Sequence, residues 1–248
     1  HILARLGGDE FAVMMAGEDS ADHAIRLAQK LVTKMAEPFL VSGHQIMSGV
    51  SIGIAIAPFD GQTAEALQRN ADLALYCAKD SGRGCWERFE NGMDVAVRER
   101  HAMERDLRNA LAADEMRLFF QPLVDVSTGK QSGFEALIRW ESAARGLVMP
   151  DEFIPLAEET GLIVPLGEWV IRAAMAEAAR WTEPLTIAVN VSPVQMRSPG
   201  LLPTIMNSLA ETGLDPARFE VEITEGVLLH ESEANMAVLH RMRDLGIK

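Results

Sequence analysis

Oxygen-bearing side chains recur at regular spacing along three apolar stretches in the second half of the chain. Glu220 and Glu222 alternate with apolar residues, Glu135 lies in a second such stretch, and Asn190 closes a third. Successive strand residues point to opposite faces, so Glu220 and Glu222 share one face. Donor sets made only of oxygen suit Mg²⁺ or Mn²⁺ better than zinc, and the 6 histidines show no paired ligand spacing. These residues predict a carboxylate site for a hard divalent cation.

Burial makes isolated carboxylates costly in such stretches. In a parallel β/α barrel one strand face points inward and the other packs under helices, so neither is freely solvated. A buried carboxylate is strongly destabilising unless it is paired or bound to a cation. A single Glu in a strand is usually an edge or surface residue, and we expect this of Glu220. Glu135 and Glu222 lie within β-rich apolar sequence, which favours a site at the carboxyl ends of the strands.

A second pair of acids lies near the start of the chain. The segment Gly7-Gly8-Asp9-Glu10 separates two short apolar runs, Ile2–Leu6 and Phe11–Ala16, which is the pattern of a β-hairpin with a glycine turn. Adjacent carboxylates repel one another, and glycine lets a ligand approach the backbone, so a metal or metal–phosphate ligand would explain them. The same residue types are common in turns, so these four residues alone are a weak signal.

Two cations lie at the end of a predicted helix that Thr63 caps and that ends near Gly82. Lys79 and Arg83 are four residues apart, which would place them on one helical face, and Arg can grip a phosphate in a fork. Cations are also favoured at helix C-termini for electrostatic reasons alone. The spacing by itself leaves both interpretations open.

Alternating apolar patterns predict the elements that position these residues. The first half is expected to contain a helix over Ala21–Ala36 and a strand over Val50–Ala57, and Phe89–Asp114 reads as a solvated connector helix. The second half alternates strands and helices, which predicts a largely parallel sheet or barrel whose first strand pair is antiparallel. The strands are expected at Arg117–Val124, Gly133–Trp140, Thr186–Ser192 and Phe219–Glu225, and the helices at Pro150–Glu159 and Gly167–Trp181.

Composition narrows the class of protein. With 48% hydrophobic and 24% charged residues the chain is of ordinary globular type, and its net charge of −13 opposes sequence-independent binding of a nucleic acid polymer. A nucleotide ligand needs only a few local donors and stays possible. The two cysteines, Cys77 and Cys85, fit a reducing compartment, and no apolar run reaches the length of a membrane span, so we expect a cytoplasmic protein.

Three motifs of the first half resemble the GGDEF family of diguanylate cyclases. They are Gly7-Gly8-Asp9-Glu10-Phe11, Ser51-Ile52-Gly53-Ile54-Ala55 and the segment 71–83, in family order and spacing. The resemblance implies that Gly7 and Gly8 face the guanine end of GTP, that Asp9 is a metal ligand and that Glu10 assists catalysis. It also implies that Lys79 and Arg83 hold the triphosphate.

From about Arg117 onward the chain resembles the EAL family of cyclic di-GMP phosphodiesterases. The matching segments are Gln121-Pro122, Glu135-Ala136-Leu137-x-Arg139-Trp140, Pro150-x-x-Phe153-Ile154-Pro155, Asn190-Val191-Ser192 and Glu222-Ile223-Thr224-Glu225. The family hydrolyses cyclic di-GMP to linear pGpG. By resemblance, Glu135, Asn190 and Glu222 are ligands of Mg²⁺ or Mn²⁺, and Glu135 and Glu222 are thereby catalytic. Arg139 would contact a phosphate, Gln121 would line the dinucleotide site and Glu225 would anchor the following loop.

The expected fold class is α/β. Residues 1–88 would form the C-terminal part of a palm-like (ferredoxin-like) GGDEF domain, 89–114 a connector helix, and 115–248 the N-terminal part of a TIM-like EAL barrel. The chain opens inside one strand and stops where another should begin, so we expect a piece of a longer protein that by itself lacks appreciable activity. We expect the parent to be a homodimer with a sensory input domain upstream.

The parent is expected to hydrolyse cyclic di-GMP, with a GGDEF domain that makes cyclic di-GMP from two GTP or senses GTP. A degenerate receptor that binds cyclic di-GMP or GTP without catalysis is the main alternative. An unrelated barrel hydrolase explains neither the hairpin motif nor the order of the two halves.

Overall fold

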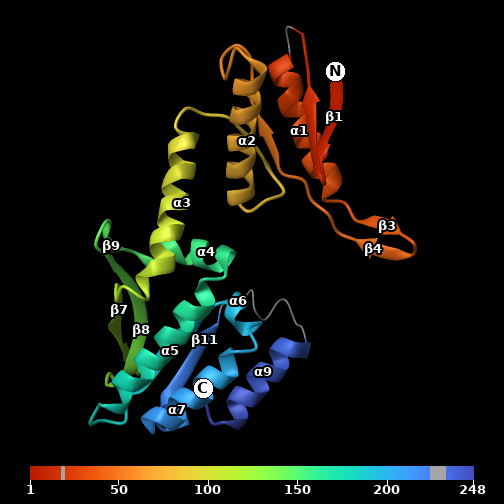
Figure 1. Ribbon diagram of the computed structural model, residues 1–248. Helices are drawn as coiled ribbons and strands as arrows, with labels where there is room; N and C mark the ends of the chain where they lie inside the picture. Colours follow the sequence, from red (N-terminus) through yellow and green to blue (C-terminus); the bar gives the residue numbers. More distant parts are fainter. Residues whose placement is uncertain (18–19, 224–232) are drawn as a thin grey trace. The chain divides into compact units, whose positions relative to one another are not determined.

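The computed structural model describes residues 1–17, 20–223 and 233–248 (Figure 1). The chain divides into two compact units, His1–His101 and Ala102–Lys248, and each is described by itself. Within the described residues no helix has both the length and the apolar character needed to cross a membrane.

The first unit combines short strand pairs with two long helices. Its strands β1 and β2 form the antiparallel hairpin that the sequence predicts, and β5 pairs with β6 in parallel. A small core of Ala28, Ile54 and Ile56 joins α1 to β5. The elements are β1 (Ile2–Gly7), β2 (Glu10–Met14), α1 (Ser20–Met35), β3 (Phe39–Val41), β4 (His44–Ile46), β5 (Ile52–Ile54), α2 (Ala64–Asp80), β6 (Trp86–Arg88) and the first part of α3 (Met93–Ala110).

Helix α2 begins where the sequence predicts and ends earlier than the phosphate interpretation requires. The Thr63 hydroxyl accepts a hydrogen bond from the backbone N–H of Ala66 at 3.2 Å, which confirms the predicted N-cap. The helix ends at Asp80, and Gly82 and Arg83 then take φ values of 105° and 61°. The backbone at Arg83 is therefore no longer helical, and the prediction that Arg83 shares a helical face with Lys79 is wrong.

The strand expected over Val50–Ala57 is regular only at Ile52–Ile54. The reason is a turn that begins inside the expected strand. The backbone N–H of Ile56 donates to the Asp60 carboxylate at 2.8 Å, and the N–H of Asp60 donates to the carbonyl of Ile56 at 2.7 Å. These bonds use the backbone groups of Ile56 that a longer strand would offer to a neighbour.

Gly53 permits a very close approach of α2 to β5. A Cβ atom at this position would lie 2.0 Å from the carbonyl oxygen of Ala71 and 2.2 Å from the backbone nitrogen of Leu75. Both atoms belong to the helix backbone, so neither can rotate away. The glycine of the Ser51-Ile52-Gly53-Ile54-Ala55 motif is thus required by helix–strand packing.

Two features of this unit were not expected from the sequence. The three-residue strand β6 was not anticipated, and neither was the β3–β4 hairpin, which projects from the helices of its unit (Figure 1). Leu40 and Val41 of the hairpin are exposed. Strands of three residues carry too little periodicity to be recognised.

The second unit is built on one mixed sheet. The strand order is β11–β10–β8–β7, with β9 paired to the outer part of β8. The elements are the last part of α3, β7 (Met116–Val124), β8 (Gln131–Ser142), β9 (Gly146–Val148), α4 (Pro150–Thr160), α5 (Ile163–Ala179), β10 (Thr186–Val191), α6 (Pro193–Met196), α7 (Leu201–Thr212), the short 3₁₀ helix η1 (Pro216–Arg218), β11 (Phe219–Ile223) and α9 (Glu233–Asp244).

Strand directions agree with the sequence prediction. The pair β7–β8 is antiparallel, whereas β8, β10 and β11 run parallel. The outer edge of β11 is not bare, because the backbone N–H of Val221 donates to the carbonyl of Lys248 at 2.8 Å. The N–H of Lys248 in turn donates to the carbonyl of Phe219 at 3.1 Å, so the residues after α9 run alongside this edge.

One face of the sheet is apolar and covered by helices. Residues of α5 and α7, among them Ile171, Met175 and Ile205, pack with Val189 and Phe219 of the strands, and all five are buried. Figure 1 shows α5 and α7 alongside the strands of this sheet. Since strand side chains alternate, the intervening residues of β8, β10 and β11 point to the opposite face.

The connector helix is less solvated than its charge pattern predicts. Leu107 and Ala110 of α3 are buried, and they join a core cluster around Met116 and Trp140. The expectation of a solvated helix is thus wrong for its last turns. The charges that suggested solvation line the other sides of the helix, where the Arg108 guanidinium meets the Glu104 carboxylate at 2.9 Å.

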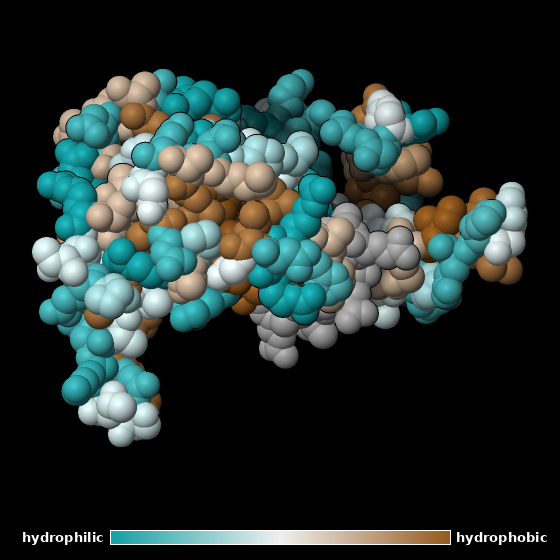
Figure 2. Space-filling model, turned by 90° about the horizontal axis from the view of Figure 1, so that it is seen from below, coloured by the Kyte–Doolittle hydropathy of each residue, from teal (hydrophilic) through white to brown (hydrophobic). Residues whose placement is uncertain are grey.

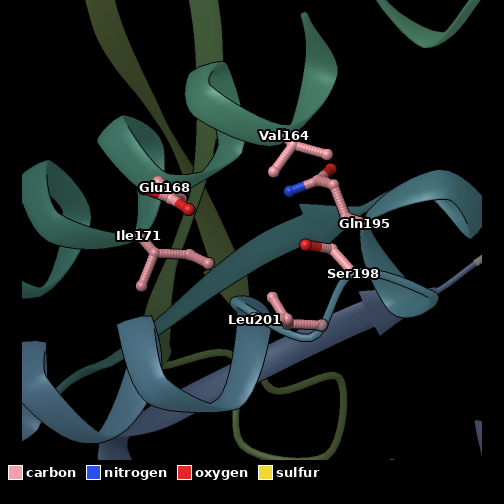
Figure 3. A pocket seen from close by; sticks show the side chains of 6 residues that line it. All are labelled: Val164, Glu168, Ile171, Gln195, Ser198 and Leu201. Carbon is pink, nitrogen blue, oxygen red and sulfur yellow. The ribbon is translucent and has the colours of Figure 1, made fainter. Parts of the chain in front are cut away.

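A buried glutamine fixes the segment that follows β10. Gln195 of α6 is 4% exposed, and its carbonyl oxygen accepts from the N–H of Ser192 at 3.0 Å. Its amide points from α6 toward α5, where a Cβ on Gly167 would lie 1.7 Å from Nε2. The adjoining cavity, of about 10 Å³ (Figure 3), has room for one water at most. The cavity results from the packing of α5 against the segment that follows β10. It is lined by Val164, Glu168, Ile171, Gln195, Ser198 and Leu201.

Arg218 connects η1 to the chain that precedes β10. Its guanidinium donates to the backbone carbonyls of Leu185 at 2.9 Å, Ala178 at 2.8 Å and Glu183 at 3.3 Å. Ala178 belongs to the last turn of α5, where the helix dipole favours a cation. This one side chain therefore satisfies three loop and helix-end carbonyls just before β11.

Replacing Arg218 with Ala should lower the free energy of unfolding of the second unit by about 2 kcal/mol, because charge-assisted hydrogen bonds to three carbonyls are lost. Urea unfolding followed by tryptophan fluorescence measures the change. The matched control is Arg197→Ala, because Arg197 is exposed and its replacement should change stability by less than about 0.5 kcal/mol. Equal midpoints for the two variants would contradict the role given to Arg218.

Candidate active site on the polar face of the second sheet

The three residues expected to bind a metal lie on the polar face of the sheet of the second unit, opposite to the face that α5 and α7 cover. Strand register places Asn190 of β10 directly beside Glu222 of β11, and Glu135 of β8 beside Ala188 of β10. The Asn190 side-chain amide donates a hydrogen bond of 2.6 Å to Oε1 of Glu135. The structure thus brings together side chains from three neighbouring strands that are separated by up to 87 residues in sequence.

Negative charge accumulates around Glu222. Partial burial raises the pKa of the Glu222 carboxyl above its ordinary value, and the nearby charges of Glu135 and Glu220 raise this pKa further. Glu220 lies on the edge strand β11, as expected, but it is half-buried and contributes to this electrostatic environment. A bound cation would be stabilising here, because it would offset the repulsion that the neighbouring carboxylates exert on ionised Glu222.

The donors fit a hard divalent cation. Glu135 and Glu222 offer carboxylate oxygens, and Asn190, whose nitrogen is engaged by Glu135, has its carbonyl oxygen free to accept. No group of three or more His, Cys, Asp and Glu side chains forms a ready metal site in the part of the chain that the structure describes. Two carboxylates and an amide would supply part of an octahedral shell, as is usual for Mg²⁺, which retains water or takes substrate oxygens.

Gln121 and Arg139 lie on the same sheet as the acids. Gln121 of β7 is paired directly with Glu135, and its side chain is exposed. Arg139 lies four residues after Glu135 on β8, so the two side chains share a face. The Arg139 guanidinium donates to the carbonyl of Ile138 at 2.8 Å and lies 5.6 Å from the ring centre of Phe119.

The acids of the first unit lie at the tip of the β1–β2 hairpin. Gly8 takes a φ of 51°, and its carbonyl accepts from Nε and Nη2 of Arg5 at 2.9 and 2.7 Å. Asp9 and Glu10 are exposed there, next to Gly7. The hairpin thus presents both carboxylates to solvent, as the sequence predicts.

The structure does not bring the remaining predicted GTP residues to this tip. Lys79 lies in the last turn of α2 and Arg83 lies beyond it, and both are exposed. Among the residues that the structure describes, no hydrogen bond, ion pair or ring contact connects either cation to Asp9 or Glu10. Glu225, the expected loop anchor, lies outside the described residues.

Phe119 was missed by sequence reasoning. It lies two residues before Gln121 on β7 and therefore on the same sheet face, where it is 47% exposed. Its partner in the register is Leu137, the residue between Glu135 and Arg139 on that face. Strand alternation counted back from Gln121 would have located it.

Comparison with protein families agrees with this geometry. The model of the EAL domain matches residues 104–248, and the model described as "Diguanylate cyclase, GGDEF domain" matches residues 1–85. The EAL match covers more than half of the chain, so the chain belongs to the EAL family, and the GGDEF match covers the part of the chain that precedes it.

Similar curated proteins match almost the whole chain. A signaling protein of Caulobacter vibrioides is 46% identical over 99% of the chain, which corresponds to 30% of that relative. The bifunctional diguanylate cyclase/cyclic di-GMP phosphodiesterase MucR of Pseudomonas aeruginosa is 39% identical over 99% of the chain and 36% of its own length. The cyclic di-GMP phosphodiesterase PdeR of Escherichia coli is 36% identical over 99% of the chain and 37% of its own length. The chain spans about a third of the length of these relatives.

Solved structures support the fold. The structure titled "PaMucR Phosphodiesterase, c-di-GMP complex" superposes with a TM-score of 0.56 at 36% identity, covering 59% of this chain and 61% of that one. The EAL domain of Xanthomonas citri FimX, solved with c-diGMP, gives a TM-score of 0.56 at 22% identity over 62% and 61%, which speaks for the fold alone. The α/β fold class, with the second unit as the N-terminal part of an EAL barrel of TIM type, is thereby confirmed.

Proposed function

We propose that this protein is a metal-dependent phosphodiesterase that hydrolyses cyclic di-GMP to linear pGpG on the polar face of the second sheet. The observation that carries the proposal is the hydrogen bond between Asn190 and Glu135, with Glu222 next to Asn190 in the register. Relatives named as cyclic di-GMP phosphodiesterases support the substrate class. EAL phosphodiesterases depend on a metal ion, and the oxygen donors here favour Mg²⁺ or Mn²⁺.

Each residue has a part in this chemistry. Glu135, Asn190 and Glu222 would hold the cation, which when bound activates a water and stabilises the leaving oxygen. The Asn190 amide orients the Glu135 carboxylate, because it engages one of that residue's oxygens. Arg139 would bind the phosphate oxygens in a fork, and the exposed amide of Gln121 would hydrogen-bond the dinucleotide beside Glu135. Glu225 is proposed as the anchor of the following loop.

The GGDEF half is proposed to make cyclic di-GMP from two GTP or to bind GTP as a sensor. Gly7 and Gly8 would approach the guanine, Asp9 would hold a metal ion and Glu10 would assist catalysis at the hairpin tip. Lys79 and Arg83 would bind phosphate from two separate segments. Two GTP molecules must meet for cyclisation, so a homodimer is part of the proposal. The domain limits proposed are 1–88 and 115–248, with 89–114 between them, and the protein is proposed to be cytoplasmic.

Thermal unfolding with and without Mg²⁺ tests the metal site. The pKa of Glu222 is raised in the folded state. The free energy of unfolding is therefore highest below the ordinary pKa of Glu, where the carboxyl is protonated, and it falls as the pH rises through the raised pKa. At pH 8, Mg²⁺ at a hundred times its Kd should stabilise the native chain by about 2.7 kcal/mol. Glu222→Gln should lose this response, and without metal it should be as stable as the native chain or slightly more so.

The matched control is Glu211→Gln, which removes one carboxylate from the exposed side of α7 and should keep the full response to Mg²⁺. At pH 4 the response should weaken in the native chain, because protonated carboxyls bind cations poorly. An undiminished response in Glu222→Gln would overturn the assigned site. Cyclic di-GMP that is bound but not converted to pGpG would overturn the enzymatic proposal in favour of a receptor.

A further inference from the structure

The polar face carries an aromatic ring that the core does not need. The neighbouring residue on β7, Phe120, points to the covered face and meets the rings of Phe134 and Trp181 at 6.5 and 6.3 Å between ring centres. Phe119 points the other way and remains 47% exposed. Helix packing therefore explains Phe120 and leaves Phe119 without a role in the helix-covered core.

The surroundings of Phe119 separate it from other exposed aromatic residues. Phe59 is 83% exposed, and exposure by itself indicates no function. Phe119 lies on the face of Gln121 and Glu135, and the guanidinium of Arg139 lies 5.6 Å from its ring centre. A flat apolar surface thus adjoins a cation that can bind phosphate and carboxylates that can bind a metal.

That combination suits a nucleotide better than a simple phosphodiester. Proteins hold unpaired bases by stacking them on aromatic side chains, while cations track the phosphates. Arg139 approaches the Phe119 ring at a distance typical of a cation–π contact, and such a contact holds the guanidinium beside the ring. The half-exposed part of the ring remains open to a base.

We propose that Phe119 stacks on a purine base of the dinucleotide substrate and so makes this face selective for a base-carrying phosphodiester. The proposal rests on the proposed function, because it assigns a base subsite to the same face. Phe119 would add affinity for the base, whereas Arg139 would bind the phosphate. Stacking contributes about 1–3 kcal/mol per base, so loss of the ring should weaken binding about tenfold or more.

A fluorescent analogue tests this directly. In a cyclic dinucleotide with 2-aminopurine in place of one guanine, the fluorescence of the base falls when it stacks. Saturating concentrations of the native chain should quench the probe, and Phe119→Trp should quench it as well. Phe119→Leu, which keeps apolar volume but removes the ring, should bind about tenfold more weakly and leave the bound probe bright. Phe59→Leu is the matched control and should behave like the native chain.

The outcomes separate the two proposals. If the native chain does not bind the probe at all, the assignment of this face to cyclic di-GMP fails, and the base subsite fails with it. If the native chain and Phe119→Leu both bind and quench the probe equally at saturation, the proposed function survives and the stacking role is overturned. If Phe119→Leu weakens binding but the bound probe is still quenched, Phe119 acts by positioning Arg139, and stacking is likewise overturned.

Discussion

Replacing Glu135 with Gln should lower the rate of cyclic di-GMP hydrolysis by about a thousandfold, because a cation at such a site supplies several kcal/mol of transition-state stabilisation. The substitution keeps the shape of the side chain and removes the charge that faces Asn190 and Glu222. The measurement is the rate at which the full-length protein forms pGpG, followed by chromatography. The Kd for Mn²⁺ should rise in the same variant.

Glu141→Gln is the matched control for this variant. Glu141 lies at the far end of the same strand, where it forms a half-exposed ion pair with Arg117 at 3.2 Å, and exposed pairs contribute little to stability. Its replacement should leave both turnover and Mn²⁺ affinity within about twofold of the native values. Full turnover in Glu135→Gln would contradict the assignment of the active site to this face of the sheet.

Gly53→Ala should destabilise the first unit by about 3 kcal/mol or more, because the added methyl group collides with helix backbone that cannot rotate away. The expected contacts of 2.0 and 2.2 Å to Ala71 and Leu75 are well inside van der Waals distance. Only separation of α2 from β5 would relieve them. Hydrogen exchange is the appropriate measurement, because it reports α2 separately from the second unit.

The control for Gly53→Ala is Gly49→Ala. Gly49 has open space where its Cβ would lie, so the substitution should be neutral or stabilising by about 0.5 kcal/mol through the unfolded state. In Gly53→Ala, the amides of α2 should exchange much faster while those of α5 keep their protection. Unchanged protection of α2 would show that the helix can shift on the strand at little cost.

Much of the second unit could be predicted from its sequence because its strands are long and sharply alternating. The antiparallel pair β7–β8, the parallel strands that follow it, and the common face of Glu135 and Glu222 all agree with prediction. Alternation also contained the information for Phe119, but only the three-dimensional neighbourhood of Arg139 shows why that position matters. A sequence pattern assigns a face to a residue and says little about the companions on that face.

The first unit was harder to predict because single side-chain and backbone bonds decide its boundaries. The Asp60 carboxylate ends the strand after Ile54 by binding the N–H of Ile56. Two positive φ values after Ser81 turn Arg83 away from the helix that carries Lys79. Neither event changes the hydrophobic periodicity, so the sequence pattern continues past the residues at which the strand and the helix end.

The cluster of Glu135, Glu220 and Glu222 also has a consequence for the order in which ligands arrive. The three carboxylates outweigh the guanidinium of Arg139, and the other guanidinium on this face, that of Arg117, is paired with Glu141. Without metal, this cluster is therefore an electrostatic barrier to a dinucleotide with two phosphate charges. Divalent cations that bind first would reverse the local sign and turn that barrier into an attraction. By linkage, the apparent affinity for the dinucleotide should then rise with the free cation concentration, and the site would bind its substrate tightly only after it has bound metal.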